Sequence, residues 1–155
     1  MIQRIQTLYL LLATVAMSLT LFMPLATLWQ GDNEIVVKAW FADGTLGFKA
    51  PLPIYLGIML SITAALPLII IFLYKKRMVQ IRLCVSEIVL LLGSVAFVGI
   101  YGYLLHDALS EIMPELHFTL GFASLMPVVA IIFVALAIRS IARDEALVRS
   151  LDRIR

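Results

Sequence analysis

The sequence predicts an all-α membrane protein with four transmembrane helices in an antiparallel bundle. Of its 155 residues, 63% are hydrophobic and 14% are charged, whereas soluble domains are nearer half apolar and a quarter charged. The apolar residues form four long runs, each with at most one formal charge. Because crossing the hydrocarbon core takes roughly 20 apolar residues, we expect a single four-helix membrane domain over residues 1–155.

The four predicted spans cover residues 7–29, 54–74, 83–105 and 118–138. Backbone polar groups cannot stay unpaired in lipid, so we expect each span to be helical. Pro24, Pro67 and Pro127 fall within three of these runs, where neighbouring helices would tolerate them as kinks. The first run is too long for a signal-peptide core and no clear cleavage site follows it, so we expect a retained helix.

The distribution of positive charge predicts how the bundle is oriented. Two of the twelve Lys and Arg residues, Lys38 and Lys49, fall in the loop between the first two spans. The other ten fall at the opposite end of the bundle: Arg4, Lys75, Lys76, Arg77, Arg82, Arg139, Arg143, Arg149, Arg153 and Arg155. Cytoplasmic segments carry the excess of basic residues. We therefore expect a bacterial inner-membrane protein with both termini in the cytoplasm.

The first extracytoplasmic loop, residues 30–52, carries a strand pattern. β-branched and aromatic residues alternate up to Asp43 and Gly44, and a second short run follows. An Asp-Gly pair between two such runs predicts a two-stranded β-hairpin. An isolated hairpin is marginal in water, so we expect Trp40, Phe41 and Phe48 to contact the membrane surface, the helix ends or a partner.

The cytoplasmic tail, residues 139–155, has helical spacing. Leu147, Leu151 and Ile154 fall at i, i+4 and i+7, and Glu145 lies four residues before Arg149. The tail is therefore expected to extend the fourth helix or to bend along the cytoplasmic surface. Contact with lipid and docking of a protein partner both remain open for it.

Glu87 is the one formally charged residue within a predicted span, and a charged residue there is a functional hypothesis by default. Glu87, Ser94 and Tyr101 recur at seven-residue intervals, so they share one helix face within about 40°. Polar residues in membrane helices usually face other helices. We expect Glu87 to set helix register by pairing with Arg4, Arg82 or Arg139, while a contact with a partner's helix and a proton or ion path remain alternatives.

A similar polar stripe is predicted on the first helix. It consists of Gln3, Thr7, Thr14 and Ser18. These residues lie within about 60° of one another on a helical wheel, and we expect them to face the other helices together with Arg4.

The sequence offers little for catalysis. His106, Asp107, Glu111, Glu115 and His117 are the only cluster that resembles metal ligands, but their spacing matches no known site, and we expect a solvated acidic turn. The single cysteine, Cys84, allows no intramolecular disulfide. We therefore expect no enzyme, no cofactor, no metal and no nucleic-acid partner.

The amino-terminal sequence MIQRIQTLYLLLA resembles the opening of a membrane family of Bacteroidota known as domain of unknown function 4293. The family is similar to this chain in length, in its four predicted spans, in a basic loop after the second span and in a charged tail. The resemblance implies a bacterial inner-membrane location and transfers no catalytic residue.

These observations favour a non-enzymatic accessory, stabilising or assembly subunit of a larger membrane complex. Its expected partners are membrane lipids and one or more other inner-membrane proteins. The alternative is a small homo-oligomeric transporter or channel, lined by Glu87, Ser94, Tyr101 and the polar stripe of the first helix. A membrane enzyme acting on lipid or envelope precursors, with His106 and His117 at the outer surface, is a third and weaker hypothesis.

Overall fold

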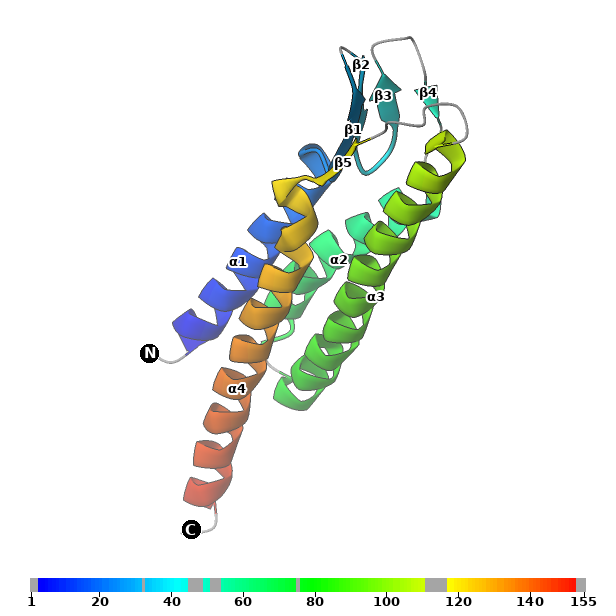
Figure 1. Ribbon diagram of the computed structural model, residues 1–155. Coiled ribbons are helices and arrows are strands. Elements are labelled where there is room, and N and C mark those ends of the chain that lie inside the picture. Colours follow the sequence, from blue (N-terminus) through cyan, green and yellow to red (C-terminus); the bar gives the residue numbers. More distant parts are fainter. Residues whose placement is uncertain are drawn as a thin grey trace.

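Four long helices form the body of the protein. The computed structural model describes residues 3–31, 33–44, 49–50, 54–74, 76–110 and 117–152, without the side chains of residues 3–4, 30, 49–50 and 149–152. The helices are α1 (Gln3–Phe22), α2 (Ile54–Phe72), α3 (Arg77–Ser110) and α4 (Met126–Asp152), with a short 3-10 helix η1 (Phe122–Leu125) before α4. α1 and α3 each lie against both α2 and α4 (Figure 1). Each of the four is long and apolar enough to cross a membrane, so the prediction of four such helices is confirmed.

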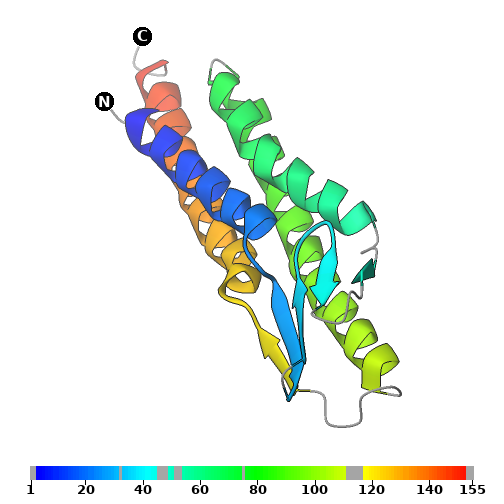
Figure 2. The ribbon, with the colours of Figure 1, turned by 90° about the horizontal axis from the view of Figure 1, so that it is seen from above.

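A five-stranded antiparallel sheet covers one end of these helices. Its strands are β1 (Ala26–Gln30), β2 (Asn33–Val37), β3 (Ala42–Gly44), β4 (Lys49–Ala50) and β5 (His117–Leu120), in the order β4-β3-β2-β1-β5. Figure 2 shows the sheet at one end, while α1 begins and α4 ends at the other. The mostly helical fold is as expected, but the predicted two-stranded hairpin is corrected to a five-stranded sheet, because β5 comes from the distant loop before α4 and joins β1.

The turn of the first hairpin also differs from the prediction. Asp43 and Gly44 lie within β3 rather than in a turn. The β1–β2 connection pairs Gln30 with Asn33 and leaves two residues between them. Gly31 adopts a φ of 58° there, a conformation that glycine reaches without steric cost. The Gly31-Asp32 pair is also a two-residue hairpin signal in the sequence.

The first predicted span, residues 7–29, is only partly helical. α1 ends at Phe22 because Pro24 disfavours helical backbone at the preceding residue. The chain then enters β1, which is paired on both sides by β2 and β5. β1 has partners on both edges and buries residues such as Leu28. Its sequence therefore extends the apolar run of α1, and the predicted span continued into the strand.

The fourth predicted span, residues 118–138, begins too early for the same reason. Its first residues form β5 and η1, and α4 begins at Met126. Pro127 therefore occupies the first turn of α4, where its missing N–H costs nothing, and among the described prolines Pro67 alone lies in the interior of a helix. The expectation that the tail extends the fourth helix is confirmed up to Asp152.

The sheet rests on α2 and α3 through two glycines. α3 has 34 residues, or roughly 51 Å of helix, and so continues well beyond the predicted 83–105 toward the sheet. The Trp40 indole fills the space in which a Cβ of Gly57 would lie, and the Phe118 ring lies 3.1 Å from where a Cβ of Gly102 would be. The two aromatic side chains therefore pack the sheet onto the helices, with a collision for any Cβ at Gly57 and a tight contact for one at Gly102.

Candidate functional site

The predicted polar stripe of α3 is largely buried. Glu87 and Ser94 are fully buried, and Tyr101 is half-buried against the hydrophobic core. The Ser94 hydroxyl donates to the carbonyl of Leu90 in its own helix at 3.0 Å. Neither carboxylate oxygen of Glu87 has a hydrogen-bond partner among the described residues. Glu87 is thus an interior acidic group without a visible counterpart.

The expected ion pair of Glu87 with Arg82 or Arg139 is not found. Both arginines are exposed, and neither meets the carboxylate. A pairing with Arg4 stays a prediction, because the side chains of Gln3 and Arg4 lie outside the described part of the chain.

The predicted stripe of α1 does not form the buried face of that helix. Thr7 is exposed, and Thr14 and Ser18 are half-buried. The hydroxyls of Thr14 and Ser18 donate to the carbonyls four residues earlier in α1, at 3.1 and 2.8 Å. The buried polar residues of α1 are instead Gln6 and Thr20. The interhelical or partner contacts expected of Gln3 and Thr7 stay a prediction.

A cluster of polar side chains joins the helices at the end away from the sheet. The Gln6 side-chain amide on α1 donates to the Asp144 carboxylate on α4. Arg77, in the first turn of α3, donates to the Asp144 carbonyl at 3.3 Å, and its guanidinium lies 4.0 Å from the Glu145 carboxylate. Together with Gln80, these residues are called the terminal polar cluster.

Gln80 connects the terminal polar cluster to α2. Its side-chain amide is buried and donates to the carbonyl of Ile70 at 3.2 Å. Ile70 lies in the last turn of α2, and its carbonyl also accepts the backbone N–H of Leu73 at 3.1 Å. The cluster therefore contacts α1, α2, α3 and α4. It was missed in the sequence because Gln6 and Asp144 stand 138 residues apart, although an acid in a basic tail was a visible signal.

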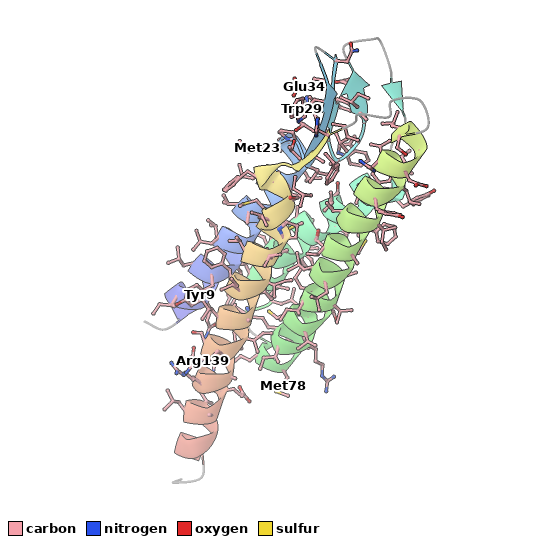
Figure 3. All side chains as sticks on the ribbon, in the orientation of Figure 1. Tyr9, Met23, Trp29, Glu34, Met78 and Arg139 are labelled. Carbon is pink, nitrogen blue, oxygen red and sulfur yellow. The ribbon has the colours of Figure 1, made fainter. Side chains whose placement is uncertain are left out.

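The predicted outer-face residues divide between the sheet and the helix ends. Trp40 and Phe41 are both partly exposed, and the Lys38 ammonium lies 5.3 Å from the centre of the Phe41 ring. Trp40 also packs on Gly57, so it supports the sheet. Figure 3 places Trp29 and Glu34 at this sheet and Arg139 near the opposite end of the helices. Phe48 lies outside the described residues.

The tail residues are described only in part. Leu147 is exposed on α4. Leu151 belongs to α4 but its side chain is not described, and Ile154 lies beyond the described residues. Glu145 faces Arg77, and the side chain of its expected partner Arg149 falls outside the description.

The acidic turn provides aromatic contacts where the sequence suggested metal ligands. The rings of Trp29 and His117 lie 4.7 Å apart, and His106 meets Phe118 edge-on at 6.4 Å. Within the described ranges, His, Cys, Asp and Glu do not gather in a group of three or more suited to a metal ion. Glu111 and Glu115 are outside these ranges.

Strand β5 forms an open edge of the sheet. It pairs with β1 on one side, and among the described residues no strand pairs with its other side. Gly121 donates its N–H to the carbonyl of Leu25 at 2.8 Å. Because bonded and non-bonded pairs alternate along an antiparallel ladder, the N–H groups of Phe118 and Leu120 point away from β1.

The sequence matches the family described as "Domain of unknown function (DUF4293)" over residues 2–154. The chain belongs to this family. The match spans nearly the whole chain and confirms the resemblance noted from the amino-terminal residues. No curated protein gives a significant match to it. The DUF4293 description carries no activity, so the function has to be argued from the geometry above.

Proposed function

We propose that this DUF4293 chain is a non-enzymatic, multi-pass protein of the bacterial inner membrane that serves as an accessory, stabilising or assembly subunit of a larger membrane complex. The four apolar helices support insertion, since large apolar side chains project outward from each of them, for example Leu8, Ile58, Val89 and Ile132. Such a surface would be costly in water and is ordinary in lipid.

The proposed orientation puts both termini in the cytoplasm. Ten of the twelve basic residues belong to the end of the bundle away from the sheet or to the tail that follows it, and cytoplasmic segments carry such an excess. The sheet then lies on the outer face, and the terminal polar cluster lies near the cytoplasmic surface.

The open edge of β5 is the observation that carries the subunit proposal. Two backbone N–H groups point outward along this edge, and the Leu120 side chain is 63% exposed beside them. Proteins usually cover or blunt such edges because they pair readily with other strands. A strand from a partner can be added there through backbone hydrogen bonds. The proposed partner is therefore an envelope protein with an extended segment outside the membrane.

Site-specific photo-crosslinking tests this proposal. A photoreactive residue at position 120 is expected to trap one protein in intact cells. The matched control is position 89, because Val89 is 64% exposed on α3 and faces the proposed lipid phase. Absence of a protein adduct from position 120, or the same adducts from both positions, would overturn the proposal.

A small homo-oligomeric transporter is the second candidate, favoured by the buried Glu87. Ser94 lies on the same buried face of α3, but Leu91 is fully buried between them, so the polar groups do not form a continuous file. Flux in proteoliposomes that is lost in Glu87→Gln or in Ser94→Leu would support this candidate over the subunit. Flux that is absent, or that survives both changes, would remove it.

A further inference from the structure

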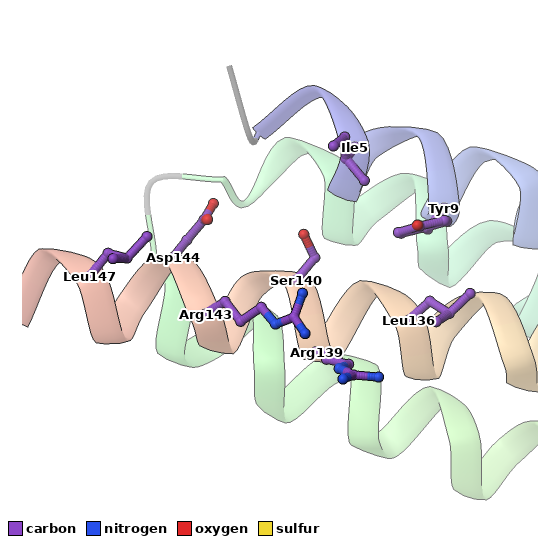
Figure 4. A pocket seen from close by; sticks show the side chains of 8 residues that line it. All are labelled: Ile5, Tyr9, Leu136, Arg139, Ser140, Arg143, Asp144 and Leu147. Carbon is purple, nitrogen blue, oxygen red and sulfur yellow. The ribbon is translucent and has the colours of Figure 1, made fainter.

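A groove runs between α1 and α4 at the end away from the sheet. It has a volume of about 470 Å³. Figure 4 shows Ile5 and Tyr9 of α1 on one side and Arg139, Ser140 and Arg143 of α4 on the other. Arg139 is the first charged residue after the long apolar run of α4. In the proposed membrane orientation, the groove therefore opens at the level of the lipid headgroups on the cytoplasmic side.

The groove presents two guanidinium groups that no described residue of the chain compensates. Arg139 and Arg143 are one helical turn apart and exposed, an arrangement in which like charges repel. Within the described part of the chain, neither has a hydrogen bond or an ion pair. The planar guanidinium fork matches phosphate geometry. A phosphate between the two side chains would relieve their repulsion.

Asp144 also lines the groove but is turned toward the protein. It is only 7% exposed, and one of its oxygens accepts the Gln6 amide. Its other oxygen is covered by protein. The charged surface open to a ligand is therefore the pair of guanidinium groups. The two arginines and Asp144 together carry a formal charge of +1. This charge complements a ligand with one negative charge and favours it over a zwitterion.

The other end of the groove is apolar. Leu136 lies three residues before Arg139, or about 4.5 Å along the axis toward the centre of the proposed span. Tyr9 of α1 lies beside it in the lining. Toward the centre of the proposed span the groove thus changes from charged to apolar, as a membrane lipid does, while Leu147 lines it on the other side of Arg143. Free phosphate would use only the charged end.

We propose that this groove binds an anionic phospholipid of phosphatidylglycerol type. The lipid phosphate lies on Arg139 and Arg143, and an acyl chain passes along Leu136 and Tyr9. Basic pockets between membrane helices on the cytoplasmic side are suited to anionic headgroups. The inference rests on the proposed membrane insertion, and it requires no protein partner.

Native mass spectrometry of the purified chain in mild detergent provides the test. The protein is titrated separately with phosphatidylglycerol, phosphatidylethanolamine, phosphatidylcholine and inorganic phosphate. The double variant Arg139→Gln/Arg143→Gln is expected to lose phosphatidylglycerol affinity by about thirty-fold, at about 1 kcal/mol for each basic residue. The matched control is Arg82→Gln, because Arg82 is also exposed but lies on α3. Arg139→Lys/Arg143→Lys keeps the charge and should retain more affinity than the Gln pair.

The proposal is supported if the protein binds phosphatidylglycerol preferentially and only Arg139→Gln/Arg143→Gln loses this binding. Equal loss in Arg82→Gln, equal binding of phosphatidylethanolamine, or displacement by inorganic phosphate would overturn it. Circular dichroism of each variant checks that the helices are intact. The assay uses the isolated chain, so its outcome is independent of the crosslinking at position 120. Loss of the chain from membranes at high pH would instead count against membrane insertion itself.

Discussion

The side-chain amide of Gln6 donates a hydrogen bond to the carboxylate of Asp144, and this bond connects the start of α1 to the last turns of α4. Both residues are buried. Arg77 reaches the backbone of the same Asp144 from α3. Asp144 is therefore held from two other helices, through its carboxylate by α1 and through its backbone carbonyl by α3, at a place where each of those helices begins.

The first prediction concerns this bond. Gln6→Leu should lower the free energy of unfolding by about 1–3 kcal/mol, because it leaves a buried carboxylate without its donor. Gln6→Leu/Asp144→Leu should recover part of that loss, with a coupling of about 0.6 to 1.7 kcal/mol. Unfolding in mixed micelles measures both. Thr14→Val serves as control, since the Thr14 hydroxyl bonds only to its own helix, and additive effects of the two Leu changes would contradict the prediction.

The packing of Trp40 on Gly57 gives the second prediction. Gly57→Ala should destabilise the protein by about 1–3 kcal/mol, because a Cβ would collide with the indole ring. Gly99→Ala is the matched control, since open space surrounds that position in α3 and alanine favours helix. Thermal unfolding in detergent measures both variants. Equal effects of the two substitutions would show that Trp40 does not rest on Gly57.

Much of the helical fold could be predicted from the sequence, including α2 to within two residues, but most other boundaries could not. The apolar runs located all four helices. The errors fell where strands continued such a run, at Ala26–Gln30 and His117–Leu120, because strands packed against a core are as apolar as a membrane helix. Glu87 and Ser94 were correctly placed on one face of α3. Their surroundings depend on contacts between distant helices, and no local pattern encodes these.

The terminal polar cluster shows the same limit. The Asp144 and Glu145 pair was visible as acid within a basic tail, and Gln6 as a polar residue beside an apolar run. Nothing in either segment indicates that the two meet. The pairing follows only once α1 and α4 are packed side by side.

Glu87 leads to the third prediction. A buried, uncharged polar group without a hydrogen bond costs about 1–3 kcal/mol, so Glu87→Leu should raise the free energy of unfolding of the isolated chain by a similar amount if no residue outside the described part pairs with Glu87. Ser94→Ala is the control, because the Ser94 hydroxyl is bonded within its own helix and its loss should change little. Denaturation in micelles provides the measurement. Destabilisation by Glu87→Leu would reveal a partner for this carboxylate, with Arg4 the first candidate.

The fourth prediction tests the proposed orientation by cysteine labelling. The background variant is Cys84→Ala, since Cys84 is the single native cysteine and is buried. Asp43→Cys on β3 and Lys76→Cys before α3 both introduce a thiol at an exposed position. A membrane-impermeant maleimide applied to spheroplasts should label position 43 and leave position 76 unlabelled until the membrane is permeabilised. The reverse pattern would place the sheet in the cytoplasm.

The fifth prediction concerns the outward backbone N–H of Leu120, and its measurement tests the subunit account most directly. The chain, Leu120→Ala and Leu120→Pro are each purified from cells in mild detergent, and copurifying proteins are quantified by mass spectrometry. Leu120→Ala keeps the N–H group, whereas Leu120→Pro removes it without touching the ladder to β1. The account predicts a stoichiometric membrane partner with the unaltered chain and with Leu120→Ala, and at least about tenfold less of it, or about 1.4 kcal/mol, with Leu120→Pro. A chain that purifies alone, or a partner retained by Leu120→Pro, would contradict it.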